Sequence, residues 1–261
     1  MCIRDSNVSF SNSITHLGTE VFTGAPFINA YPDGIIYIDK CLYKYKGVMP
    51  AETTIEVADG TTQICEKAFR AMRGLVGVTI PSSVEEICDQ AFYGCIKMTS
   101  VTIGDGARSI GNNCFSGCVS LESVTFGAAM TTIGNEAFSD CAKIETLRSG
   151  ASVPPVLGDN ALTSLDKWTT VVYVPNGCVA DYEAADGWSD FLYIVGDQSG
   201  NCDIAADQLL IEGGVLHCNG IDTEVYNLSG VQVYSGNGNV QLATGTYIVV
   251  AAGRATKVAV K

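Results

Sequence analysis

The chain has 261 residues, 47 % of them hydrophobic, and 28 acidic against 15 basic side chains give it a net charge of −13. This charge argues against nucleic acid as a partner, because no cluster of Lys and Arg overrides it. No apolar run approaches the roughly 20 residues of a membrane-spanning helix, so we expect no membrane span. The length allows one elongated domain and a smaller one, and the 28 glycines favour short strands and tight turns.

The N-terminal region is the least regular part of the sequence. Residues 1–13 fit no later pattern and contain no apolar segment of a secretion signal, so we expect a non-native or truncated start with the signal peptide lost. Residues 33–38 and 42–45 carry alternating aromatic side chains, which predicts a β-hairpin. Residues 54–57 then predict a strand. The repeat array described next is expected to begin at about residue 14.

Apolar residues recur every 23 residues between Ile64 and Leu147. The clearest columns are Ile64, Ile87, Ile110 and Ile133; Phe69, Phe92, Phe115 and Phe138; and Met72, Cys95, Cys118 and Cys141. A fixed period of this length predicts a solenoid, in which each repeat buries its apolar face only against its neighbours. Within each repeat we expect one helical turn, first at Glu66–Arg70, and one strand, first at Val78–Ile80.

Stacking these strands in register predicts a parallel sheet with ladders of outward-facing side chains. The ladders are Thr79, Thr102, Thr125 and Arg148; Gly77, Ser100, Ser123 and Thr146; and Val76, Thr99, Glu122 and Glu145. The candidate partner-binding residues are Thr79, Thr102, Thr125, Arg148, Ser100, Ser123, Glu122 and Glu145. Their polar side chains on a rigid sheet suit contact with proteins or glycans.

The cysteines of the repeats occupy columns that Met and Ala also occupy. They are Cys95, Cys114, Cys118 and Cys141. Residues that alternate with Met and Ala are small core hydrophobes, so we expect buried free thiols. The alternative is a metal site at Cys114 and Cys118, which no second pair or nearby histidine completes. A disulfide between Cys202 and Cys218 remains open.

Motifs of catalysis are missing from the sequence. It contains no Gly-x-Ser-x-Gly elbow, no His-Glu-x-x-His and no phosphate-cradling glycine loop. Its two histidines, His16 and His217, are far apart and leave few candidates for a general base. We therefore expect a non-catalytic protein without cofactor or metal. Calcium at Asp105, Asp140 or Asp159 is the weaker alternative.

Residues 150–196 are expected to cap the repeat stack. Pro154 and Pro155 stop the ladder, since proline cannot donate a hydrogen bond to a neighbouring strand. A strand is predicted at 171–174 and a short amphipathic helix at 179–185. The aromatic side chains of this part are expected to cover the open end of the core. A sugar-stacking platform of Trp168 and Trp188 is the alternative.

The pattern Ile-Gly-x-x-Ala/Cys-Phe-x-x-Cys-x-x-Leu-x-x-Val-x-Ile resembles the BspA-type leucine-rich repeat. With the segments at 33–37 and 172–175, the resemblance covers about residues 14–196. Proteins of that family are mostly surface or secreted molecules of anaerobic bacteria and some protists, and are associated with adhesion. The resemblance implies an α/β leucine-rich-repeat solenoid, strand-rich, with repeats at 14–149 and a cap at 150–196.

Residues 197–202 are polar and predict a linker, and residues 203–261 predict a small all-β immunoglobulin-like sandwich. Its expected strands are 208–211, 215–218, 224–228, 231–234, 240–242, 246–251 and 257–260. Three motifs in this part resemble the C-terminal sorting domain of the type IX secretion system of Bacteroidetes. Their residues are Gly230, Gly245, Tyr247, Lys257 and Lys261. The resemblance implies export by the outer-membrane secretion machinery; an immunoglobulin-like sandwich without that role is the alternative.

Together these expectations describe a secreted or cell-surface adhesion protein, located outside the cell or on the outer-membrane surface. Its repeat sheet would contact host or bacterial surface proteins or glycans. Two alternatives remain open. The chain could be a docking or glycan-binding appendage of a larger exported enzyme, or a structural surface spacer without a ligand.

Overall fold

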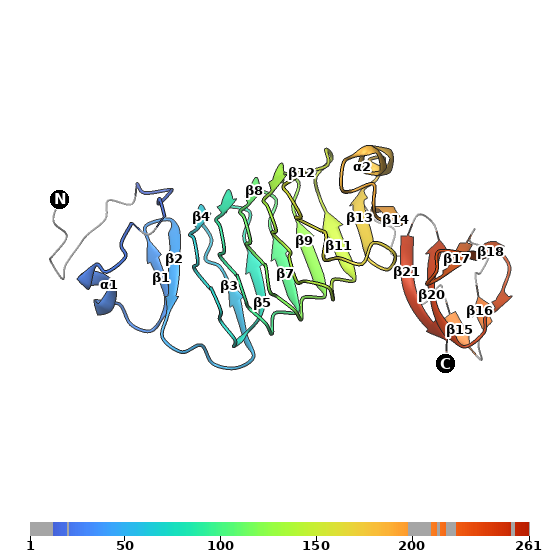
Figure 1. Ribbon diagram of the computed structural model, residues 1–261, viewed down its shortest axis with the longest axis horizontal. Coiled ribbons are helices and arrows are strands. Elements are labelled where there is room, and N and C mark those ends of the chain that lie inside the picture. The colour runs from blue at the N-terminus through green and yellow to red at the C-terminus, as the bar shows by residue number, and fades with distance from the viewer. Residues whose placement is uncertain are drawn as a thin grey trace. The chain divides into compact units, whose positions relative to one another are not determined.

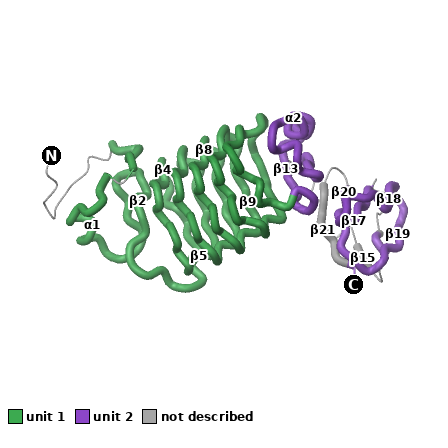
Figure 2. Tube along the Cα trace, in the orientation of Figure 1, with its two compact units in different colours: residues 1–166 green, residues 167–261 purple. Residues whose placement is uncertain are grey.

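The computed structural model describes residues 13–19, 21–197, 210–212, 215–217, 223–251 and 254–260. The chain divides into two compact units, residues 1–166 and 167–261 (Figure 2). The expected truncated start and the expected linker lie almost wholly outside the described residues. Among the described residues, no helix combines the length and the apolar character that crossing a bilayer requires.

The first unit begins with the short helix α1 (Pro26–Ala30) and an antiparallel hairpin of β1 (Gly34–Ile38) and β2 (Cys41–Lys46). The hairpin confirms the prediction, whereas α1 was not predicted. Around it the side chains form a small apolar core, in which the rings of Phe22 and Phe27 meet edge to face at 5.2 Å between centroids. This core closes the N-terminal end of the repeat stack.

Two sheets run along the repeats, and both place consecutive repeats side by side (Figure 1). The first continues from β2 through the parallel strands β4 (Gln63–Ile64), β6 (Glu86–Ile87), β8 (Ser109–Ile110), β10 (Thr132–Ile133) and β12 (Val156–Leu157). In the second, neighbouring strands are β3 (Thr53–Glu56), β5 (Leu75–Ile80), β7 (Ser100–Ile103), β9 (Ser123–Phe126) and β11 (Thr146–Ser149). The predicted strand-rich solenoid with 23-residue repeats is thereby confirmed.

The core between the sheets consists of the predicted apolar columns. The aromatic column is fully buried and comprises Phe69, Phe92, Phe115 and Phe138. Neighbouring rings of this column are parallel, with centroids 5.2 Å apart and interplanar angles of 8°, 1° and 7°. A repeat therefore buries each ring only by lying against the next repeat, as the period predicts.

The predicted helical turns are wrong. In the first of them, Ala68 N–H donates to the Cys65 carbonyl at 3.2 Å, which is a tight turn rather than a helical bond. Alternate amides leave the segment: Phe69 N–H donates to Ala91 O of the next repeat at 2.7 Å. Lys67 has a left-handed φ of 60°. In a helix these alternate amides would donate hydrogen bonds within the same segment, whereas in this turn they donate to carbonyl groups of the next repeat.

The second unit contains β13 (Val171–Pro175), α2 (Val179–Ala184) and β14 (Tyr193–Asp197), with β13 and β14 parallel. The predicted strand and helix of this part are both confirmed. Tyr182 of α2 and Trp188 are fully buried, and their rings meet edge to face at 5.1 Å.

The remaining strands form two small sheets, β15–β16–β19 and β18–β17–β20–β21. Their bounds are Leu210–Glu212, Val215–His217, Thr223–Asn227, Gln232–Gly236, Val240–Gln241, Gly245–Ala251 and Arg254–Val260 for β15 to β21 in order. Each predicted strand has a counterpart here. A shared apolar cluster, including Leu216, Val225 and Val260, joins the two sheets. Two small packed sheets support the sandwich, and the immunoglobulin-like arrangement stays a prediction.

Candidate functional site

The outer face of β3, β5, β7, β9 and β11, here called the ladder face, presents the predicted polar columns in register. Thr102 of β7 lies opposite Thr79 on one side and Thr125 on the other, and Thr125 lies opposite Arg148. Thr79 and Thr102 are exposed, and Thr125 and Arg148 are half-buried. In-register pairing brings neighbours to about 4.8 Å spacing, so the column offers closely spaced hydroxyl groups.

The second column is also in register, with Ser100 between Gly77 and Ser123. The structure adds β3 to the face, because Glu56 lies opposite Thr79 and Thr54 lies opposite Gly77. Both residues were missed as ladder members. The signal was present, since each lies 23 residues before its partner, the same interval that separates later repeats.

The third column lies just before the strands. Glu122 N–H donates to Thr99 O at 2.8 Å, and Glu145 N–H donates to Glu122 O at 2.9 Å. The Glu122 and Glu145 side chains are exposed. Two carboxylates on adjacent repeats make this margin of the ladder face acidic, so the face combines a neutral hydroxyl centre with a charged margin.

The cysteine column fills the core, as predicted. Cys95, Cys118 and Cys141 are free and fully buried, and their thiols donate to Phe carbonyls of the preceding repeats at 3.1, 3.3 and 3.1 Å. Burial raises the pKa of the Cys141 thiol to about 12. In the described part of the chain, no group of three or more His, Cys, Asp or Glu could hold a metal ion. The Cys202–Cys218 pair lies outside the described residues.

The suspected sugar platform is contradicted at one of its two residues. Trp188 is fully buried beside Tyr182 and Phe191, where no sugar could stack on it. Trp168 is 59 % exposed and does not share a surface with it. Packing inside the unit therefore accounts for Trp188.

The residues of the predicted sorting motif lie in a turn and on two neighbouring strands. Gly230 lies in the turn after β17 with a φ of +74°, and a Cβ there would lie 2.9 Å from Leu192 Cδ2. Gly245 and Tyr247 lie on β20, and Lys257 lies on the neighbouring strand β21. Lys261 is outside the described residues. The left-handed φ favours glycine at position 230, and a Cβ there would require the end of the Leu192 side chain to shift.

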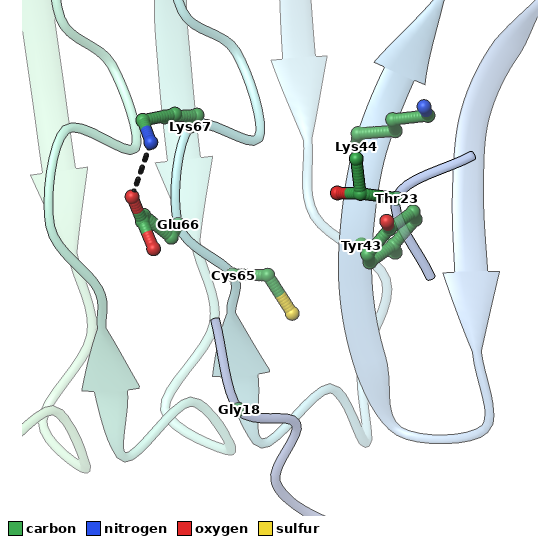
Figure 3. A pocket seen from close by; sticks show the side chains of 7 residues that line it. All are labelled: Gly18, Thr23, Tyr43, Lys44, Cys65, Glu66 and Lys67. Atoms are coloured by element: carbon green, nitrogen blue, oxygen red, sulfur yellow. Dashed lines mark ion pairs between the residues drawn. The ribbon is translucent and has the colours of Figure 1, made fainter. Parts of the chain in front are cut away.

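A cavity of about 140 Å³ lies at the N-terminal end of the repeats (Figure 3). It is lined by Gly18, Thr23, Tyr43, Lys44, Cys65, Glu66 and Lys67. Lys67 Nζ and a Glu66 carboxylate oxygen form an ion pair of 2.6 Å on one wall. The sequence did not predict this cavity, because its lining residues are far apart in the sequence and come together only in the folded chain.

Comparison with protein families is informative for the repeats. Residues 49–166 match the family model of the BspA type leucine rich repeat region, in six copies. This stretch is a leucine-rich repeat region. The match agrees with the resemblance of the 23-residue pattern, and it extends through residue 166, past the predicted end of the repeats at residue 149. A comparison with curated proteins found no match.

Solved structures with a similar course include three bacterial proteins. The leucine rich repeat protein of T. pallidum is 24 % identical, with 57 % of this chain and 84 % of that chain covered and a TM-score of 0.37. The pneumococcal vaccine antigen PcpA is 16 % identical, with 61 % and 44 % covered and a TM-score of 0.47. A leucine rich cell surface protein of Faecalibacterium prausnitzii is 19 % identical, with 71 % and 57 % covered and a TM-score of 0.37. The chain thus spans less than two thirds of the latter two.

Proposed function

We propose that this protein is a non-catalytic binding protein of the cell surface, whose ladder face contacts surface proteins or glycans of a host or of other bacteria. The observation that carries the proposal is the ladder face itself, where Thr79, Thr102 and Thr125 stand in register on neighbouring strands. Hydroxyl groups donate and accept hydrogen bonds, and a rigid sheet holds them in place before contact, which lowers the entropic cost of binding. The leucine-rich repeat match supports a scaffold for contact.

A screen tests this function directly. The 261-residue chain is applied to immobilised extracellular-matrix proteins and to a glycan array, beside the variant Thr102→Arg and the control Thr132→Arg. Thr132 is exposed on β10, in the other sheet, so the control introduces the same bulk and charge away from the ladder face. We expect hits that Thr102→Arg loses and Thr132→Arg keeps. Hits that survive Thr102→Arg would place binding elsewhere, and a screen without hits would favour a spacer.

We also propose that residues 203–261 direct export through the type IX machinery, as the resemblance of their three motifs implies. Surface labelling of cells that express the full chain or a chain ending at residue 202 tests this. We expect the shortened protein to remain inside the cells. Equal surface display of both proteins would contradict the proposal and would leave the alternative of a sandwich without an export role.

The appendage alternative differs in what it predicts for the gene. A hydrolase domain encoded next to this chain in the same polypeptide would favour a docking or glycan-binding appendage. The ladder face could bind a partner in a separate surface protein and in an appendage of an enzyme. A neighbouring hydrolase domain would therefore identify the larger protein and would not change the proposed binding surface.

A further inference from the structure

Two free cysteines pack together in the apolar core that closes the N-terminal end of the repeat stack. Cys41 is fully buried at the start of β2, and Cys65 is buried directly after β4. The strands β2 and β4 are parallel neighbours, in which Cys41 lies opposite Gln63. The Cys65 sulfur in turn lies 3.7 Å from the Oε1 atom of Gln63. The fold therefore holds the two thiols close to each other on neighbouring segments.

A hydrogen bond between the two thiols makes them chemically unequal. Cys65 donates to the Cys41 sulfur, and this bond lowers the pKa of the Cys41 thiol against the opposing effects of burial and of the Asp39 carboxylate. The same bond, together with burial, raises the pKa of the Cys65 thiol. Because the thiolate is the reactive form of cysteine, Cys41 is the better nucleophile of the two.

Cys65 connects this pair of thiols to the cavity at the N-terminal end of the repeats. It lines the cavity, and Figure 3 shows its sulfur pointing from the turn after β4 towards β2. A volume of about 140 Å³ admits an oxidant as small as hydrogen peroxide. Cys118 of the cysteine column, in contrast, is fully buried inside the repeats and does not line this cavity.

We propose that Cys41 and Cys65 form a site of oxidative modification, where a peroxide links them by a disulfide that ties β2 to the turn after β4. The Cys41 sulfur attacks one peroxide oxygen, so that an S–O bond forms, the O–O bond breaks and one water leaves. The Cys65 sulfur then attacks the sulfenic sulfur, so that the S–S bond forms, the S–O bond breaks and a second water leaves. Each sulfur gives up one electron, the peroxide takes both, and the two thiol protons leave in the waters. This site is separate from the ladder face and goes beyond the proposed function.

Cys88 is the competing partner for Cys65. It follows β6 as Cys65 follows β4, so it lies at the equivalent position of the next repeat. Burial and the carboxylates of Glu86 and Asp89 raise the pKa of the Cys88 thiol to about 12. It is therefore a weaker nucleophile than Cys41, and we expect the disulfide to form with Cys41.

Peptide mapping tests the proposal. The reduced 261-residue chain is treated with hydrogen peroxide, its remaining thiols are blocked with N-ethylmaleimide, and its tryptic peptides are analysed without reduction by mass spectrometry. Cys41 and Cys65 fall in different peptides, residues 41–44 and 47–67, and we expect these two peptides to be joined until dithiothreitol separates them. Cys41→Ala should abolish the link. Cys88→Ser is the matched control and should keep it.

The same samples show whether the disulfide ties the N-terminal hairpin to the repeats. We expect oxidation to raise the thermal midpoint of the wild-type chain by about 4 °C or more, because the cross-link restricts the unfolded chain. In Cys41→Ala the oxidised and reduced midpoints should be equal. If that variant does not fold, the wild-type chain before and after dithiothreitol gives the same comparison.

Three outcomes would overturn the proposal. The first is a wild-type chain whose peptide 41–44 stays unlinked after peroxide treatment. The second is a link between peptide 47–67 and the peptide of residues 74–97, which contains Cys88. The third is a linked chain that unfolds at the same temperature as the reduced chain, since a disulfide without that effect would not tie the two segments together.

Discussion

At the residue scale, the cysteine side chains of the repeats both fill the core and donate hydrogen bonds to backbone carbonyl groups. Cys118 fills a space that admits a small apolar side chain, and its thiol also donates to the Phe92 carbonyl at 3.3 Å. Met72, the first member of the column, is half-buried and has no thiol to donate. The sequence predicted the burial of these thiols from their alternation with Met, but the thiol–carbonyl bonds required the stacking geometry.

Buried thiols should resist chemistry in the folded protein. We expect iodoacetamide at pH 8 to leave Cys95, Cys118 and Cys141 unmodified until denaturant is added, because burial excludes the reagent. The hydrogen bond with Cys95, together with burial, raises the pKa of the Cys118 thiol, and burial raises the pKa of the Cys141 thiol. Mass spectrometry of tryptic peptides measures the modification. Cys178, which is half-buried, is the internal comparison. Rapid alkylation of Cys118 in the native protein would contradict its placement.

The same thiols make stability depend on pH in one direction. In the unfolded chain the Cys141 thiol ionises near pH 9, whereas in the folded protein its pKa is about 12. The unfolded state therefore loses protons first, and the free energy of unfolding should be fully retained below pH 9 and fall as the pH rises toward 12. Urea denaturation at a series of pH values measures this. Cys141→Ala should flatten the decline, and an equally steep decline would assign it to other groups.

Gly111 lies where the backbones of two neighbouring repeats approach too closely for a side chain. A Cβ at this position would lie 2.5 Å from the backbone nitrogen of Asp89 in the preceding repeat. We expect Gly111→Ala to destabilise the protein by about 1–3 kcal/mol through overpacking, measured by chemical denaturation. Gly77→Ala is the control, since its nearest neighbour, Ser100 Oγ, would lie at 3.5 Å. The control should be neutral or slightly stabilising, and equal losses in both variants would rule out the close approach as the cause.

At the element scale, the turn between the two strands of each repeat is the part that sequence reasoning described wrongly. A run such as Glu66–Arg70 has a helix-like spacing of apolar residues, yet its amides alternate between the same turn and the next repeat. Local propensity could not reveal this, because the stacked neighbour supplies half of the hydrogen-bond partners. The strands were easier, since β-branched alternation at Val78–Ile80 has no competing helical interpretation.

The left-handed residue of each turn provides a test of its geometry. Glu136 has a φ of 52° and Asn113, at the equivalent position one repeat earlier, has a φ of 53°. Asn adopts this conformation more readily than other residues that carry a side chain. We expect Glu136→Asn to stabilise the protein by up to about 1 kcal/mol and Asn113→Val to destabilise it by about 1–2 kcal/mol, as measured by thermal and urea denaturation. Opposite signs would show that these turns are not left-handed in solution.

At the scale of the whole molecule, the 23-residue period determines most of what the sequence could predict. Because the period equals one turn of the solenoid, residues such as Thr79 and Thr102 must be neighbours, and the ladder face follows from counting. The apolar core that closes the N-terminal end of the repeat stack could not be predicted from the period. Leu17 N–H donates a hydrogen bond to the side chain of Gln63, which lies 46 residues later in the sequence. No repeated sequence pattern predicts this contact. The cavity beside that bond was therefore beyond sequence reasoning.

We propose that the ladder face is the contact surface of the protein. The most direct measurement is the dissociation constant of the strongest hit of the screen for the wild-type chain, for Thr102→Arg/Thr125→Arg and for Thr132→Arg, by biolayer interferometry. Two arginines at adjacent ladder positions would obstruct any partner seated on that face, so we predict at least a tenfold weakening for the double variant and wild-type affinity for Thr132→Arg. Unchanged affinity in a correctly folded double variant would contradict the claim.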